Sequence, residues 1–223
     1  TTVFQNGKCN NDGFKFIIME VKSFWHIDKN YSEIQSKNIE NEGIENAIHL
    51  KSAYSAISLG TEKLVATGNV PKEMYEKMKV PYMEGNFDFP IKYGYSLVGQ
   101  TTENNWVHLM HPHQDNIIVN QDNCYVLSPE TNPIVATQLS NLETVINAIW
   151  TSKVKKGDLV LVCGTGSVGI LLARTLKKHI QAEVFIQETN EVKKEKLVEW
   201  GFELCNSKTN YDICFNVSAN ANG

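Results

Sequence analysis

Hydrophobic and polar positions are arranged differently in the two parts of the chain. The first part carries short runs of strand character without a helical period, which predicts a mostly β region. These runs lie at 20–27, 46–55, 106–110 and 116–120. After residue 140, strand-length apolar runs alternate with stretches in which apolar residues recur at helical spacing. Strands are expected at 160–163, 183–188, 202–206 and 211–217, with helices at 170–180 and 191–200. Such alternation is typical of a parallel α/β sheet.

Two further helices and one irregular strand are expected between these runs. Pro71 followed by charged residues and Met predicts a short surface helix over 71–78. Ser140 and Glu143 have the spacing of a capping box, which predicts a helix that extends to Trp150. The glycines within 91–100 indicate close backbone approach rather than a plain strand.

The most specific motif is Gly164-Thr165-Gly166-Ser167-Val168-Gly169, which follows an apolar strand and precedes a helical pattern. In a dinucleotide-binding loop the first glycine permits the tight turn. The second admits the pyrophosphate, and the third lets helix and strand pack closely. Glu188 lies nineteen residues beyond Gly169, where such a fold places the carboxylate that binds the adenosine ribose. The alternative is a glycine-rich turn in an ordinary α/β domain.

Length and charge limit the class of partner. The 223 residues suffice for one domain and a large part of another. With 21 basic and 25 acidic side chains the net charge is −4, and no basic run is long enough to follow a phosphate backbone, so we expect no nucleic-acid partner. The sequence shows no charged-then-apolar leader pattern and no apolar stretch of membrane-spanning length, so we expect neither a secretory leader nor a membrane span. We therefore expect a cytoplasmic protein with a small-molecule substrate and no membrane partner.

The five cysteines are odd in number and contain no Cys-x-x-Cys pair. This spacing argues against a disulfide framework and against a structural zinc site. Cys163, Cys205 and Cys214 fall in or beside apolar runs, so we expect them to be buried and reduced.

Several segments together resemble the medium-chain dehydrogenase/reductase superfamily over residues 20–217. They are Ile57-Ser58-Leu59-Gly60-Thr61-Glu62, Lys92-Tyr93-Gly94-Tyr95, His111-Pro112-His113-Gln114, Asn141-Leu142-Glu143-Thr144, Lys156-Gly157-Asp158 and the glycine motif. Within the superfamily the chain is most similar to the zinc-dehydrogenase-like branch that includes relatives of bacteriochlorophyllide dehydrogenase.

The resemblance implies an α/β protein with two domains. A GroES-like, mostly β catalytic domain would occupy 19–134, and the first half of a Rossmann doubly wound parallel sheet would occupy 135–223. Residues 1–18 would be an unassigned N-terminal extension. The implied activity is an oxidoreductase reaction, in which a hydride passes between a nicotinamide cofactor and an alcohol or carbonyl substrate.

The sequence departs from the zinc-containing members at the positions of their metal ligands. Ser58 stands where they have cysteine, Tyr95 stands in place of histidine, and Asn141 stands near a cysteine or acid. Catalytic zinc requires thiolate, imidazole or carboxylate ligands. No metal site is therefore predicted, and no zinc is expected.

Without a Lewis acid, a hydrogen-bond donor or general acid must stabilise the developing alkoxide. The candidate catalytic residues are Tyr95 with Ser58 beside it, and His111 or His113. As alternatives, Tyr95 is a core aromatic residue, and the two histidines are surface turn residues or metal ligands. Glu62 is expected to have a structural role at the helix that lines the site.

Glu188 would repel a 2′-phosphate, which favours NAD over NADP, although Lys193 and Lys194 are placed to meet that phosphate. The leading hypothesis is a zinc-independent NAD-dependent dehydrogenase or reductase. The alternatives are a quinone or enoyl reductase that uses NADPH, and a catalytically silent dinucleotide-binding module or incomplete chain. Only four Rossmann strands are expected, so we also expect these residues to belong to a longer chain of roughly 320 residues that forms a homodimer.

Overall fold

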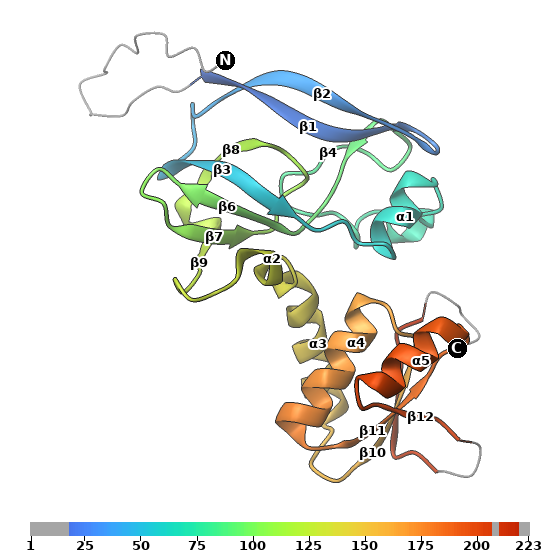
Figure 1. Cartoon of the computed structure of the whole chain (residues 1–223). Helices are drawn as coiled ribbons and strands as arrows, with labels where there is room; N and C mark the ends of the chain where they lie inside the picture. Colours follow the sequence, from blue (N-terminus) through green and yellow to red (C-terminus); the bar gives the residue numbers. More distant parts are fainter. Residues whose placement is uncertain (1–17, 207–209, 219–223) are drawn as a thin grey trace. The chain divides into compact units, whose positions relative to one another are not determined.

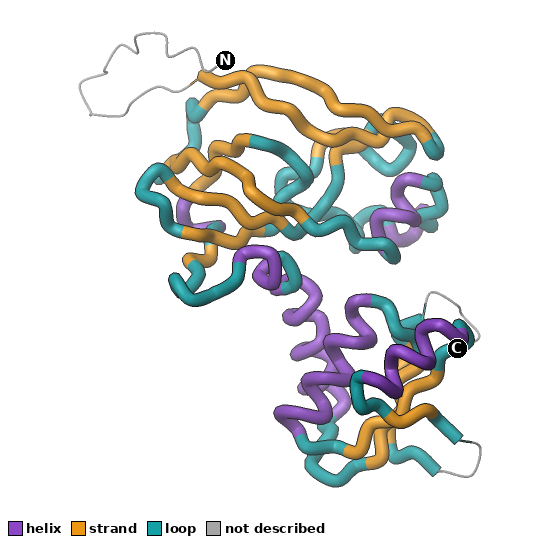
Figure 2. Tube along the Cα trace, in the orientation of Figure 1, coloured by secondary structure: helices purple, strands orange, loops and turns teal. Residues whose placement is uncertain are grey.

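The computed structural model describes residues 18–206 and 210–218, and it divides the chain into two compact units, 1–139 and 140–223 (Figure 1). Nearly all of the expected N-terminal extension, 1–18, lies outside the described residues. Figure 2 shows strands dominating the first unit, whereas helices and strands alternate in the second.

The first unit contains a four-stranded antiparallel sheet in the order β2-β1-β5-β4. Its strands are β1 (Ile18–Asp28), β2 (Tyr31–Glu40), β4 (Glu84–Gly85) and β5 (Ile91–Lys92). Strand β2 was not expected from the sequence. It forms a long hairpin with β1, but none of its residues is buried, so no apolar face marks it.

A second antiparallel sheet has the order β8-β3-β6-β7-β9. Its strands are β3 (Ala47–Ser55), β6 (Leu97–Thr101), β7 (Trp106–Leu109), β8 (Asn116–Asn120) and β9 (Tyr125–Val126). Four of the six residues of its buried apolar core are Leu50, Leu97, Leu109 and Ile117. The expected strands at 46–55, 106–110 and 116–120 are thus confirmed.

Helices of the first unit are short. They are α1 (Thr61–Ala66), the 3₁₀ turns η1 (Lys72–Met74) and η2 (Gln121–Asn123), and α2 (Pro133–Ala136). The helix expected over 71–78 is wrong, because only η1 forms there. The segment is confined between Pro71 and Pro81, and a helix of so few residues has little stability of its own.

The second unit has a parallel sheet in the order β12-β11-β10-β13, an arrangement that occurs in doubly wound folds. The strands are β10 (Leu159–Cys163), β11 (Glu183–Gln187), β12 (Glu203–Leu204) and β13 (Ile213–Asn216). The helices are α3 (Leu139–Ser152), α4 (Ser167–Thr175), a π-helical turn η3 (Leu176–Ile180) and α5 (Glu191–Glu199). One apolar core includes residues of β10, β11 and all three α-helices.

The expected capping box at Ser140 and Glu143 is wrong. Helix α3 begins at Leu139, so both residues lie inside the helix. The capping asparagine occurs earlier, at Asn132, whose side chain accepts from the N–H of Ile134 at the start of α2. The chain then passes from α2 into α3 within two residues, which removes the need for a cap at Ser140.

The expectation of three buried cysteines holds only for Cys163, whereas Cys205 and Cys214 are exposed. Cys163 ends the central strand β10. Cys205 follows β12 and Cys214 lies in β13, and these two strands form the edges of the sheet. Edge strands leave side chains open to solvent even within an apolar run.

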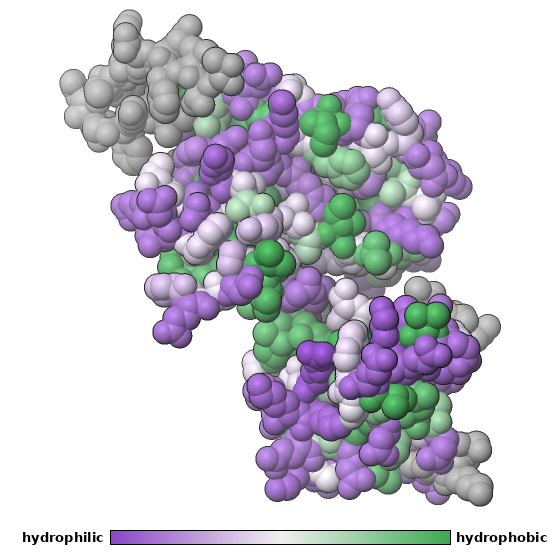
Figure 3. Space-filling view, viewed as in Figure 1, coloured by the Kyte–Doolittle hydropathy of each residue, from purple (hydrophilic) through white to green (hydrophobic). Residues whose placement is uncertain are grey.

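The face shown in Figure 3 is mostly polar, with scattered apolar patches. None of the helices within the described residues is long and apolar enough to cross a membrane.

Candidate functional site

The three glycines of the motif in the second unit have three different surroundings. Gly164 has φ +99°, a conformation that a side chain disfavours. A Cβ on Gly169 would lie 2.1 Å from the carbonyl oxygen of Gly164, so helix α4 reaches the loop only because no side chain is there. A Cβ on Gly166 would meet nothing within 4 Å. The loop therefore has open space at Gly166, directly at the N-terminus of α4.

That helix N-terminus suits an anion. Gly166 is its N-cap and provides no side-chain hydrogen bond, so the first N–H groups of α4 are not capped by it. Helix N-termini carry partial positive charge and bind phosphates through such N–H groups. The residues present therefore fit the pyrophosphate of a dinucleotide.

Glu188, directly after β11, lies against the same loop. The hydroxyl of Thr165 donates to Oε2 of Glu188, and the N–H groups of Thr189 and Asn190 donate to Oε1 over 2.8 and 2.9 Å. Burial favours a raised pKa, but these hydrogen bonds outweigh it and hold the pKa of Glu188 below its ordinary value. Glu188 is thus an ionised carboxylate at neutral pH, with the Nζ of Lys193 at 3.8 Å.

In the first unit, the segment between β3 and α1 folds around Glu62. The N–H of Ser58 donates to Oε1 of Glu62 over 2.7 Å, and the N–H of Glu62 donates to the carbonyl of Ser58 over 3.0 Å. The N–H of Thr61 donates to Oγ of Ser58 over 3.3 Å. Glu62 is buried, and one of its oxygens fixes this turn.

Tyr95 lies half-buried beside the start of α1, with its hydroxyl 3.5 Å from Oγ1 of Thr61. Its ring meets that of Tyr93 edge to face. Tyr93 is fully buried and donates to the carbonyl of Met78 over 2.8 Å. Burial, with the nearby charge of Glu62, raises the pKa of Tyr93. Tyr93 thus fills the core, whereas Tyr95 is only half-buried.

The two histidines are not surface turn residues, because both are buried. Nδ1 of His113 lies 2.8 Å from Oγ of Ser55, and its Nε2 lies 2.6 Å from Oε2 of Glu62. His111 instead bonds through Nδ1 to the carbonyl of Pro112 over 2.8 Å. Burial lowers the pKa of His111 to about 4, so its imidazole is neutral at pH 7.

Gly94 explains how His113 fits. It has φ +135°, and a Cβ there would lie 2.9 Å from Nε2 of His113. The close backbone approach expected within 91–100 is therefore confirmed, and its purpose is to admit this imidazole. Gly99 confirms it again, since a Cβ there would lie 2.9 Å from the carbonyl oxygen of Lys51.

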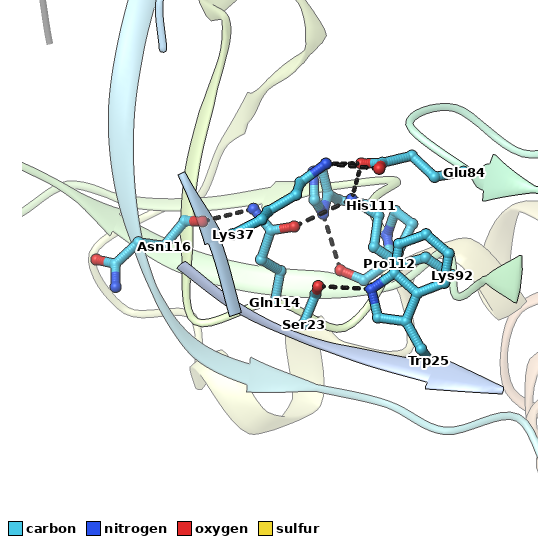
Figure 4. Close-up of polar contacts among 9 residues, drawn as sticks. All are labelled: Ser23, Trp25, Lys37, Glu84, Lys92, His111, Pro112, Gln114 and Asn116. Carbon is cyan, nitrogen blue, oxygen red and sulfur yellow. Dashed lines mark hydrogen bonds and ion pairs between the residues drawn. The ribbon is translucent and has the colours of Figure 1, made fainter. Parts of the chain in front are cut away.

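A buried lysine anchors the segment that carries both histidines (Figure 4). Lys92 contacts Oε1 of Glu84, and it donates to Oε1 of Gln114 over 3.1 Å. Gln114 in turn donates to the carbonyl of Asn116 over 2.7 Å. Lys37 also contacts Glu84, at 2.5 Å. Burial lowers the pKa of Lys92, although the hydrogen bond and the negative charge of Glu84 act to raise it.

Backbone hydrogen bonds hold the same segment to the strand β1. The N–H of Phe24 donates to the carbonyl of His113 over 3.0 Å, and the N–H of Asp115 donates to the carbonyl of Lys22 over 3.0 Å. His113 is therefore fixed from its backbone as well as from both ring nitrogens.

The structure brings Ser58, Tyr95 and His113 into one cluster through Thr61 and Glu62. His111 is bonded away from that cluster, and Asn141 lies in the second unit. Within residues 18–206 and 210–218, no three His, Cys, Asp or Glu side chains are grouped to hold a metal.

Sequence reasoning did not find the side chains of Ser55, Thr61 or Lys92. Lys92 offered a signal, because a lysine within the otherwise apolar Ile91-Lys92-Tyr93 suggests a buried partner. Ser55 and Thr61 offered none, since serine and threonine are common near turns.

No family model and no curated protein matches the chain, but solved structures do. CAD from Helicobacter pylori, solved with NADP(H), matches with a TM-score of 0.69 at 15% identity, over 91% of this chain and 70% of that one. A short chain alcohol dehydrogenase from E. coli CFT073, solved with NADH, matches with a TM-score of 0.66 at 15% identity, over 89% of this chain and 63% of that one. The quinone oxidoreductase from Coxiella burnetii matches with a TM-score of 0.61 at 16% identity, over 88% of this chain and 62% of that one.

The chain thus spans less than two thirds of the length of the last two structures. At this identity the comparison establishes the fold and nothing further. The chain has the α/β fold shared by these structures, in which a GroES-like unit precedes a Rossmann-type parallel sheet.

Proposed function

We propose that this chain is part of an oxidoreductase that transfers a hydride between a nicotinamide dinucleotide and a hydroxyl or carbonyl compound. The observation that carries the proposal is the space at Gly166, which stays open in a loop where Gly164 and Gly169 are tightly confined. The neighbours solved with NADP(H) and NADH support a nicotinamide cofactor. When bound, that cofactor supplies or accepts the hydride.

We propose NAD as the preferred cofactor. The lowered pKa of Glu188 keeps a negative charge where the adenosine ribose is expected. This charge would accept the ribose hydroxyls and repel a 2′-phosphate. Its existing bonds to Thr165 and to two backbone N–H groups fix the carboxylate in place.

The substrate would meet the cluster of Ser58, Tyr95 and His113, which offers hydroxyl, phenol and imidazole groups in place of zinc ligands. We propose that hydrogen bonds and proton transfer stabilise the developing alkoxide without a metal. The chain exposes Ile57 and Leu59 between Ser55 and α1, by 62 and 83%. This apolar surface favours a substrate with an apolar body.

The experiment follows deuterium from NADH labelled at C4, on one face or on the other, into the products of a panel of apolar aldehydes and ketones. We expect mass spectrometry to find deuterium in a product from only one of the two labelled cofactors, because an enzyme presents one face. The Gly166→Val variant serves as the control, because its binding of the cofactor is expected to be weakened. Deuterium in no product, or equal transfer by the variant, would contradict the proposal.

A quinone or enoyl reductase that uses NADPH is the second candidate. The position of Lys193, with Nζ 3.8 Å from Glu188, favours it, because a 2′-phosphate could pair with that ammonium. Relative dissociation constants for NADH and NADPH separate the candidates. Tighter binding of NADPH would favour the second.

A further inference from the structure

Three polar side chains from separate parts of the first unit form one continuous hydrogen-bonded chain. Ser55 ends β3, His113 lies between β7 and β8, and Glu62 lies in α1. Oγ of Ser55 is 2.8 Å from Nδ1 of His113, and Nε2 of His113 is 2.6 Å from Oε2 of Glu62. Both ring nitrogens are therefore engaged, one by a hydroxyl and one by a carboxylate.

The three side chains of this hydrogen-bonded series differ in burial, so its two ends are not equivalent. The side chains of Glu62 and His113 are 3 and 9% exposed, whereas Ser55 is an exposed residue. The carboxylate and imidazole are shielded from water, and Ser55 is the exposed member of the three. A substrate can therefore approach these three side chains at Ser55.

The contacts also fix which nitrogen holds a proton. An ionised carboxylate only accepts hydrogen bonds, so Nε2 of a neutral His113 must donate to Glu62. This leaves Nδ1 without a proton, as the acceptor for the hydroxyl of Ser55. A third group that orients an imidazole against a hydroxyl is the arrangement by which proteins activate serine.

We propose that Ser55 is a catalytic residue of the candidate site, with His113 as the proton acceptor behind it and Glu62 as a positioning residue. This rests on the proposed function. When an alcohol is oxidised, its O–H bond breaks and the proton passes to Oγ of Ser55, while the proton of Ser55 passes to Nδ1 of His113. The C–H electron pair leaves as hydride to the nicotinamide. Carbonyl reduction runs the same transfers backwards.

The groups around His113 are compatible with this role. His26 and His111 are both buried, and burial lowers the pKa of each, so neither adds a positive charge near neutral pH. Tyr93 faces Glu62 with a raised pKa and stays neutral. Glu62 is therefore the acidic side chain that faces the imidazole of His113, with Oε2 at 2.6 Å from Nε2. His113 also meets the ring of Phe24, which helps to exclude water.

The first test needs no cofactor. In protein with ¹⁵N-labelled histidine, NMR should show neutral His113 protonated at Nε2 and not at Nδ1. Glu62→Gln should change this pattern. If that variant does not fold, Ser55→Ala provides the second measurement, because it should shift only the Nδ1 signal. A proton on Nδ1 of neutral His113 in the unmodified chain would overturn the relay.

The second test uses NADH and benzaldehyde as an apolar carbonyl probe. Ser55→Ala and His113→Asn should each lower kcat by about 10²–10⁴-fold and leave NADH affinity within twofold. The double variant should lose no more kcat than either single variant, because the two residues act as a unit. Ser55→Thr should restore activity because it keeps the hydroxyl. The exposed Ser36, on β2, provides the matched control Ser36→Ala, which should keep full activity.

Full activity in Ser55→Ala, with loss in Tyr95→Phe, would overturn the proposal and assign proton transfer to Tyr95. If the unmodified chain reduces no benzaldehyde, the proposed function fails for that probe. The NMR measurement still judges the relay in that case, so the two failures are distinguishable.

Discussion

Removal of Glu84 should make the stability of the first unit depend on pH through Lys92. Lys92 is 2% exposed and is paired with Glu84, while the amide of Gln114 accepts its other hydrogen bond. In Glu84→Gln the ammonium would be buried with only amide partners. Breaking a buried ion pair from one side costs about 3–5 kcal/mol. Because the side chain of Glu84 is 38% exposed and water screens the pair, we expect Glu84→Gln to lower the free energy of unfolding by about 2–3 kcal/mol.

The sign of the pH dependence follows from the proton balance. Burial lowers the pKa of Lys92 and Glu84 opposes this, so the pKa falls further in Glu84→Gln. Between that lowered pKa and the ordinary value of about 10.4, the unfolded chain binds more protons than the folded chain. Stability must therefore rise with pH across this window, by about 1.4 kcal/mol for each pH unit that separates the two pKa values.

Urea unfolding followed by circular dichroism from pH 6 to pH 10 measures this effect. Lys92→Met should show no such rise, because it buries no charge, and the double variant should be more stable than Glu84→Gln alone. Lys37→Met tests the exposed partner of the same carboxylate and should cost less than about 1 kcal/mol. A loss in Glu84→Gln that is the same at every pH would refute a buried ammonium at Lys92.

Three further predictions concern the nucleotide loop and the metal. Glu188→Ala should narrow the preference for NADH over NADPH, measured as the ratio of dissociation constants, and an unchanged ratio would remove Glu188 from the site. Gly169→Ala should lower stability by about 1–3 kcal/mol, because its Cβ would lie 2.1 Å from the carbonyl oxygen of Gly164. An unchanged melting temperature would contradict that packing. Elemental analysis should find no stoichiometric zinc, since Ser58 and Tyr95 are poor ligands, and about one zinc per chain would show that other side chains bind it.

Most of the second unit could be predicted from the sequence, because its central strands are continuous apolar runs and its glycine motif has one structural solution. Val160 and Val162 share one face of β10 and are fully buried, and Leu159 and Leu161 on the other face are partly buried. Strand β2 was not predictable in this way, because every side chain of β2 stays at least partly open to solvent in its hairpin with β1.

The candidate site was predictable only in part, because its contacts are non-local. His113 was a candidate from its residue type, but its partners Ser55 and Glu62 are 58 and 51 residues away in sequence. Periodicity reports which face of an element is buried and contains no information on which side chains meet across sheets. For the same reason, one alternative from the sequence was that the two histidines are surface turn residues. A His-Pro-His turn contains no apolar pattern that would indicate burial.

Calorimetric titration of NADH into the unmodified chain and into Gly166→Val measures whether the glycine loop binds the cofactor. A side chain at Gly166 enters open space in the structure, so the variant should melt at the temperature of the unmodified chain. We predict that one NADH binds per unmodified chain and that the variant binds NADH at least about tenfold more weakly, a difference in binding free energy of about 1.4 kcal/mol. Equal affinity of the two proteins, or no binding of either NADH or NADPH by the unmodified chain, would contradict this prediction.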